Sequence, residues 1–175
     1  MAALLILIGL IALLLLMAAI LTKEMVVEKS VVINLPRQGV FDYIQYIRNH
    51  DHFNVWVMMD PTMKKEYQGT DGTVGFLYSW NSKHKMVGIG EQRITKINPG
   101  EGMEFGLRFI KPRPNVATSK MALQTLSPDQ TRVTWGFYST MKYPANLMRV
   151  MVQNMLAKDL QKGLDNLKTV LEKDK

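Results

Sequence analysis

The feature of this sequence that most constrains its fold is a helical pattern over residues 144–171, near the C-terminus. Its apolar positions recur at spacings of three and four, which places them on one face of a helix. They are Leu156, Leu160, Gly163, Leu164, Leu167 and Leu171. A helix of this length is ~42 Å long, more than a small domain needs to cross its core. The leucine face must be buried, and we expect it to pack against a sheet.

The first part of the same helix carries a different apolar face. Leu147, Met148, Met151, Val152 and Met155 point away from the leucine face. Methionine is unbranched and flexible, so it suits irregular or changeable space. We expect this methionine-rich face to be the part of the helix surface whose side chains adapt most easily to different neighbours.

Upstream of the helix, apolar and polar residues alternate in six short segments, which indicates β-strands. The segments cover residues 63–68, 74–80, 86–98, 103–109, 117–123 and 133–137. A further strand over residues 24–34, a short helix over residues 38–48 and a turn or short helix over residues 49–57 precede them. Short connections favour antiparallel neighbours, and strands without an alternating βα repeat favour an α+β fold. One sheet face is apolar and aromatic, and the long helix is the element that can bury it.

The N-terminus differs in character from the rest of the chain. Residues 1–22 hold no charged residue, and residues 4–21 form 18 consecutive apolar or glycine positions. As a helix this run spans ~27 Å, close to the hydrocarbon thickness of a bilayer. A cleaved signal peptide, the alternative, needs a basic start and a small-x-small cleavage site, and neither is well formed here. We therefore predict a retained single-pass anchor at residues 1–22 and a ligand-binding domain at residues 23–175.

All charged residues lie in the predicted domain. The 22 Lys and Arg residues outnumber the 15 Asp and Glu residues, for a net charge of +7. A basic domain beside a membrane favours contact with anionic headgroups, and a charge that only keeps the surface soluble is an equally good interpretation. The sequence contains no basic–aromatic motif of the kind that binds nucleic acid. The charges next to the anchor nearly cancel, so the positive-inside rule does not determine on which side of the membrane the domain lies. The chain has no cysteine, which excludes disulfides, thiol catalysis and thiolate metal sites.

The order of elements and several local sequences resemble a known family. The stretches VVEKSVVINLP, VFDYI, MDPTMKKEYQGTDGTVGFLYSW, VGIGEQRITKINP and KGLDNLKTVLE follow one another along nearly the whole chain. They resemble the polyketide cyclase/dehydrase-type members of the START-like (SRPBCC) superfamily, many of which carry one N-terminal transmembrane helix. The resemblance implies a helix-grip fold, in which a curved antiparallel sheet wraps a long C-terminal helix and holds a hydrophobic ligand. Where relatives tend to have a tryptophan-rich segment, this chain has His50-Asp51-His52-Phe53-Asn54-Val55-Trp56 and keeps the last tryptophan.

The apolar strand face supplies the candidate ligand-binding residues. Alternation reports burial and does not distinguish a filled core from a cavity, but the family resemblance favours the cavity. The candidates are Phe76, Tyr78, Trp80, Phe105, Leu107, Phe109, Met121, Trp135 and Phe137 from the strands, and Met151 and Met155 from the helix. We therefore predict membrane-anchored binding of a hydrophobic or amphipathic, lipid-like small molecule, without a cofactor.

An enzymatic alternative uses the same cavity. A polyketide cyclase, dehydratase or aromatase needs acid–base groups that face inward. Glu91 shares the parity of Val87 and Ile89, which makes it a candidate general base, and Tyr78 and Arg93 are the other candidate groups.

His50 and His52 form a short histidine pair, which raises the question of a metal ion. Histidines at i and i+2 share an ion only in extended backbone, and the sequence places no third ligand nearby. We expect an exposed polar turn and no metal site.

Overall fold

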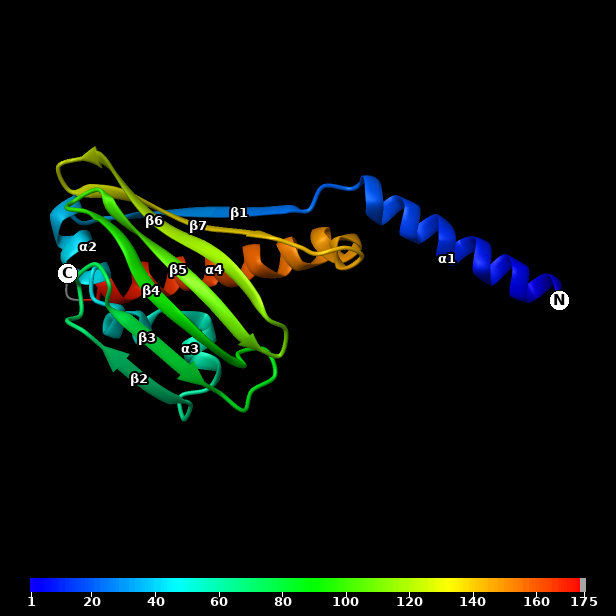
Figure 1. The fold of residues 1–175 in the computed structure, drawn as a ribbon. Coiled ribbons are helices and arrows are strands. Elements are labelled where there is room, and N and C mark those ends of the chain that lie inside the picture. The colour runs from blue at the N-terminus through cyan, green and yellow to red at the C-terminus, as the bar shows by residue number, and fades with distance from the viewer. Residues whose placement is uncertain (174–175) are drawn as a thin grey trace.

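The computed structural model describes residues 1–173, in which an N-terminal helix projects from a sheet-and-helix body (Figure 1). The first elements are α1 (Ala2–Ile20), β1 (Glu24–Ile33), α2 (Arg37–Ile44), the 3-10 helix η1 (Ile47–His52) and α3 (Val55–Met59). The strands β2 (Lys64–Gln68), β3 (Leu77–Asn81), β4 (Ile89–Asn98), β5 (Gly102–Lys111), β6 (Asn115–Ser127) and β7 (Gln130–Thr140) follow. The 3-10 helix η2 (Ala145–Met148) and α4 (Arg149–Leu171) complete the order. Residues 174 and 175, the end of the predicted domain, lie outside the described part.

The seven strands form one antiparallel sheet in the order β1-β7-β6-β5-β4-β3-β2. The first strand pairs with the last, with Glu24 opposite Thr140 and Ile33 opposite Thr131. The other neighbours are consecutive in sequence, as short turns favour. The sheet curves around α4 (Figure 1). The predicted α+β helix-grip fold is therefore confirmed.

The C-terminal half of α4 fixes the helix on the concave face of the sheet. Leu160, Leu164 and Leu167 are buried there, as the leucine pattern predicts. Gly163 lies among them, and a Cβ at this position would come within 2.8 Å of the Trp135 ring. The absence of a side chain at Gly163 therefore permits the close approach of α4 to β7.

Three helical segments differ in extent from the sequence prediction. The stretch predicted over residues 49–57 is divided between η1 and α3. The helix predicted from residue 144 begins as the tighter η2, and regular α-helix starts at Arg149. The helix predicted over residues 38–48 ends at Ile44, and the separate η1 follows it.

Two strands start later than their alternation predicts, because glycines interrupt the extended backbone. β3 begins at Leu77 rather than at residue 74, after Gly75 at φ 95°. β4 begins at Ile89 rather than at residue 86, after Gly88 at φ 64°. Both φ values are in the region that glycine adopts readily and L side chains avoid.

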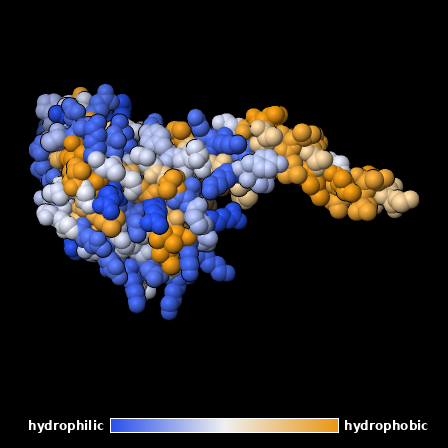
Figure 2. Space-filling view, in the orientation of Figure 1, coloured by the Kyte–Doolittle hydropathy of each residue, from blue (hydrophilic) through white to orange (hydrophobic). Residues whose placement is uncertain are grey.

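α1 is a helix of 19 residues whose side chains are almost all exposed. In Figure 2 it forms a hydrophobic rod that projects from a largely hydrophilic surface. Within residues 1–173 it is the one helix long and apolar enough to cross a membrane, and a signal sequence has the same properties.

The last turn of α1 is attached to η2 through Asn146. This side chain is buried, and its Nδ2 donates to the carbonyl oxygens of Ala18, at 2.7 Å, and Leu21, at 3.1 Å. The last carbonyls of an α-helix have no partner inside the helix. Asn146 supplies that partner and fixes the end of α1 next to the start of α4.

Candidate functional site

A cavity of about 270 Å³ lies between the concave face of the sheet and the helices that cover it. Small-molecule pockets typically measure ~300–1,000 Å³, so this cavity is slightly smaller than the lower limit of that range. Most of the predicted ligand-binding residues line it, namely Tyr78, Trp80, Phe105, Leu107, Phe109, Trp135, Phe137 and Met155. The aromatic strand face therefore borders empty space as well as filled core.

Three predicted residues are not brought to the cavity. Phe76 is buried in the filled core, with its ring stacked on Tyr67 at 6.0 Å between centroids. Met121 is also fully buried, and Met151 is 60% exposed on the outside of α4. Periodicity identified the face of each element, but it does not report what occupies the space in front of that face.

Sequence reasoning missed a second group of lining residues. They are His50, Asn54, Trp56, Val57, Met63, Met86, Val87, Gln92, Lys111, Pro112, Arg113, Ser119, Leu156 and Leu160. The position of Ser119 could have been predicted, because the alternation on β6 places it on the same face as Ala117 and Met121. The positions of the lining residues from α3, η1 and the loops could not be predicted from periodicity, since they depend on how these segments pack across the sheet.

Trp135 forms a fixed part of the cavity wall. Its Nε1 donates to Ser119 Oγ at 2.9 Å, and that hydroxyl donates to the Gly136 carbonyl at 3.1 Å. Trp56 and Phe53 meet the Trp135 ring edge-on, at centroid distances of 6.3 and 5.9 Å. Such edge-on aromatic pairs contribute about 0.5–1.5 kcal/mol beyond the buried area. This part of the wall is therefore preformed, and the side-chain polar atoms of Trp135 and Ser119 have partners.

His50 provides a buried polar group in the cavity lining. Its ring lies 5.6 Å from that of Phe105, and its Nε2 lies 3.0 Å from the Ile44 carbonyl oxygen. Because a carbonyl only accepts, Nε2 carries the proton and Nδ1 of the neutral ring is an acceptor. Burial lowers the pKa of His50, although the Ile44 hydrogen bond and the charges of Asp71 and Asp51 oppose this effect. The ring is neutral at pH 7.

Tyr78 provides a buried hydroxyl that has no hydrogen-bond partner within residues 1–173. Its side chain is 5% exposed, and its ring lies 5.4 Å from that of Tyr67 and 5.6 Å from that of Trp80. Burial raises the pKa of the hydroxyl, so it keeps its proton and remains a donor. An unpaired buried donor costs about 1–3 kcal/mol, and an oxygen atom of a ligand would remove that cost.

Glu91 does not face the cavity, so its predicted inward orientation is wrong. Its carboxylate lies 3.6 Å from Arg108 Nη1, whereas the neighbouring Gln92 lines the cavity. Val87 lies before β4, and Gly88 at φ 64° interrupts the extended backbone between Val87 and the strand. The parity counted from Val87 therefore does not continue into β4. Arg93 shares the outer face with Glu91 and donates to the Gly75 carbonyl at 3.1 Å.

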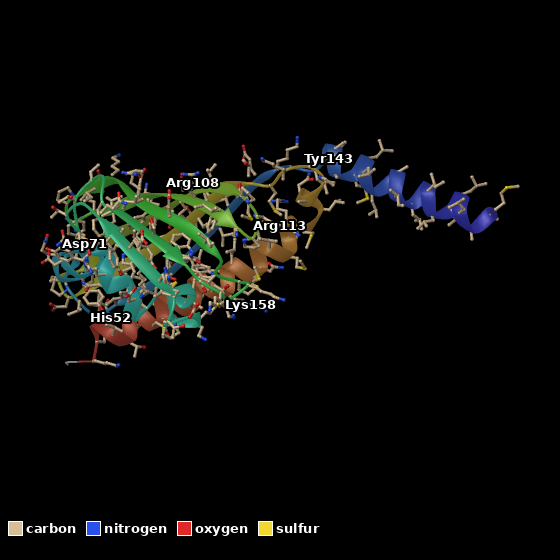
Figure 3. All side chains as sticks on the ribbon, turned by 60° about the horizontal axis from the view of Figure 1, so that its bottom comes forward. His52, Asp71, Arg108, Arg113, Tyr143 and Lys158 are labelled. Atoms are coloured by element: carbon tan, nitrogen blue, oxygen red, sulfur yellow. The ribbon has the colours of Figure 1, made fainter. Side chains whose placement is uncertain are left out.

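The mouth of the cavity is marked by lining residues that are exposed. Met86 comes from the β3–β4 connection, Lys111 from the end of β5, Arg113 from the β5–β6 connection, and Met155 from α4. Figure 3 shows Arg113 beside the first turns of α4. The mouth therefore combines flexible methionine side chains with two cations.

The two histidines of the short pair have different environments. His50 is buried, which contradicts the expected exposed turn, whereas His52 is exposed with its Nδ1 2.7 Å from the Tyr43 hydroxyl. Within residues 1–173, no three His, Cys, Asp or Glu side chains gather as a metal site.

Several solved structures share this fold. Truncated norcoclaurine synthase from Thalictrum flavum matches with a TM-score of 0.67 and 10% identity, over 88% of this chain and 97% of that chain. The Zhui aromatase/cyclase from Streptomyces sp. R1128 matches with a TM-score of 0.65 and 12% identity, over 86% and 94% of the two chains. Protein MLL2253 from Mesorhizobium loti matches with a TM-score of 0.61 and 12% identity, over 87% and 99%. At these identities the likeness establishes the fold alone.

Comparison with curated proteins gave no match. A family model described as polyketide cyclase/dehydrase and lipid transport matches residues 24–172. The matched region starts at the first residue of β1, includes all of α4 and leaves out α1. The chain therefore belongs to the polyketide cyclase/dehydrase and lipid transport family.

Proposed function

We propose that this protein binds a hydrophobic or amphipathic, lipid-like small molecule between the sheet and α4, while α1 anchors it in a membrane. The observation that carries the proposal is the cavity of about 270 Å³ with aromatic and aliphatic walls. Removing apolar ligand surface from water contributes about 25 cal/mol per Å². Ligands of this kind concentrate in the bilayer next to which α1 would hold the domain.

Two polar groups in the lining favour an amphipathic ligand over a pure hydrocarbon. The Tyr78 hydroxyl is a donor that lacks an acceptor within residues 1–173. The neutral His50 ring offers Nδ1 as an acceptor. A ligand with one hydroxyl on an apolar body suits this pair of groups best, because a hydroxyl both accepts and donates.

The contact of Asn146 supports a retained α1. Its buried Nδ2 donates to Ala18 and Leu21 at the end of that helix. Cleavage after α1 would remove the Ala18 carbonyl and leave the buried amide with fewer partners. Losing a partner of a buried polar group costs about 1–3 kcal/mol, so the contact suits an anchor better than a signal sequence.

Native mass spectrometry of the detergent-extracted full chain tests ligand binding. We expect the wild type to retain co-purified lipid-like molecules or to take up added dodecanol. Leu107→Trp replaces an aliphatic side chain with a large indole ring that fills the cavity, and we expect it to abolish this uptake. The matched control is Val116→Trp, because Val116 is exposed on the neighbouring strand. A folded wild type that never carries or accepts an apolar ligand would contradict the proposal, as would equal uptake by Leu107→Trp.

A second candidate is a cyclase, dehydratase or aromatase, and the observation that favours it is the neutral, buried His50 in the lining. A positioned general base contributes about 10²–10⁴-fold to a rate. If the protein is such an enzyme, His50→Gln loses turnover of a polyketone substrate and retains binding. Glu91→Gln is the control, because Glu91 lies on the outer face and both activities are expected to persist. Equal turnover by wild type and His50→Gln would exclude His50 as the base.

A further inference from the structure

Four exposed apolar side chains lie where α1 meets the body of the protein. They are Tyr143, Met148, Val150 and Met151, and we refer to them as the methionine patch. Val150 and Met151 are each 60% exposed. A cluster of exposed apolar side chains on a folded surface commonly marks an interaction site.

The charges in the chain segment that carries the methionine patch are all positive. Residues 141–158 contain Lys142, Arg149 and Lys158 and no carboxylate. None of these three cations is in an ion pair within the described chain. Apolar side chains beside unpaired cations match the interface of an anionic bilayer, where each cation near the surface contributes about 1 kcal/mol.

The position of the patch relative to α1 makes a lipid surface the best fitting partner. η2 is bonded to the last turn of α1 through Asn146, so the patch is held beside the end of that helix. Figures 1 and 3 agree, because α1 leaves the body at the end where η2 and the start of α4 lie, and Tyr143 lies beside the end of α1. A bilayer crossed by α1 would have its surface at this level. Tyrosine and methionine suit such an interface, since they combine apolar contact with a polar or adaptable group.

We propose that the methionine patch lies in the interface of the same bilayer that α1 crosses, so that the mouth of the cavity opens next to the lipid headgroups. This inference rests on the proposed anchoring by α1. Met155 lies seven residues beyond Met148, which is about two helical turns or ~10 Å farther along the helix axis. The contact therefore becomes shallower from Met148 toward Met155, and a lipid could enter beside Met155 without crossing water.

The absence of cysteine in the chain permits a clean labelling experiment. Single-cysteine variants of the full chain, Met148→Cys, Met151→Cys and Met155→Cys, carry an environment-sensitive fluorophore in vesicles of phosphatidylcholine and phosphatidylserine. Lipids with nitroxide groups near the headgroup act as quenchers for the patch positions, and lipids with nitroxide groups deep in the acyl chain act as quenchers for Leu10. Asp129→Cys, in the exposed β6–β7 turn, is the water-facing control, and Leu10→Cys reports on α1 itself.

We expect several-fold stronger quenching at Met148 and Met151 than at Asp129, with an intermediate value at Met155. Quenching at Leu10 together with water-like labels at Met148 and Met151 would overturn the inference and leave the anchor intact. Labels that are shielded from water but not quenched by lipid would overturn it in favour of a protein partner. A water-exposed label at Leu10 would overturn both the inference and the proposed anchoring.

Discussion

The two halves of α4 form one continuous helix but have opposite environments. In the C-terminal half, Leu160, Leu164 and Leu167 are buried against the sheet. In the N-terminal half, Val150 and Met151 are exposed and point outward. The same backbone conformation thus serves a packed core at one end and an open, adaptable surface at the other.

This difference explains how the protein can be stable and still contain a cavity. Leucine packing and the close approach at Gly163 supply the attachment of the helix, so the first turns need not fill the space in front of the sheet. Met155 and Leu156 stand at the transition, where they line the cavity. Stability and binding are therefore assigned to different halves, and substitutions in each half should have different effects.

The largest contrast is expected between Leu164→Ala and Met151→Ala. Leu164→Ala leaves a void in the core and should reduce the free energy of unfolding by about 2–5 kcal/mol. Met151→Ala changes an exposed side chain and should change that free energy by about 0.5 kcal/mol or less. Urea unfolding of the detergent-solubilised full chain, followed by tryptophan fluorescence, measures both. Similar losses in the two variants would show that the two halves do not differ as described.

A pH effect should arise from His50, which lies in the buried part of the cavity wall. Burial lowers its pKa in the folded state, so the unfolded chain takes up the proton first as the pH falls below about 6.5. The free energy of unfolding is then highest above pH 6.5 and declines toward the lowered pKa, by at most about 1.4 kcal/mol per pH unit. His50→Gln should flatten the unfolding profile over this range. An unchanged slope in that variant would indicate that His50 is hydrated or charged when folded.

A smaller effect is expected at the contact between α4 and β7. Gly163→Ala places a Cβ 2.8 Å from the Trp135 ring. Overpacking costs ~1–3 kcal/mol and better helix propensity offsets ~1, so the net loss should be about 1 kcal/mol. Lys162→Ala, on the exposed side of the same turn, is the control and should be nearly neutral. A stabilised Gly163→Ala variant would mean that α4 can move away from Trp135 freely.

The smallest effect on stability, and one of opposite sign, is expected at Tyr78. Tyr78→Phe removes a buried hydroxyl without a partner in the described chain and should raise the free energy of unfolding by about 1 kcal/mol or less. The same change should weaken binding of dodecanol while leaving binding of the hydrocarbon dodecane unchanged. Titrations by native mass spectrometry compare the two ligands. Equal losses for both would mean that the hydroxyl does not contact the ligand oxygen.

The fold could be predicted because burial leaves a periodic trace in the sequence. The spacing of Leu160, Leu164 and Leu167 marked the face of α4 that packs on the sheet. Strand alternation likewise placed Phe105 and Phe109 on the concave face. These patterns depend on local geometry alone, so one sequence is enough to detect them.

The site could be predicted only in part, for two physical reasons. First, the alternation assigned Phe76 and Tyr78 to one face, yet the first fills the core and the second borders empty space. Second, Gly88 at φ 64° breaks the extended backbone between Val87 and β4, so the alternation counted from Val87 gave the wrong orientation for Glu91. The placement of His50 depends on how η1 packs across the sheet, and no periodic signal carries that information.

Hydrogen–deuterium exchange along α4 tests most directly whether a ligand occupies the space beside its N-terminal half. The full chain, delipidated in detergent, would be compared with and without dodecanol, using Leu107→Trp as the variant with a filled cavity. We predict slower exchange in residues 149–160 on addition of dodecanol, no change in residues 161–171, and no response in Leu107→Trp. No change in exchange on addition of dodecanol would contradict a ligand bound between the sheet and this half of the helix. Exchange that slows uniformly along α4, and to the same extent in Leu107→Trp, would contradict it as well.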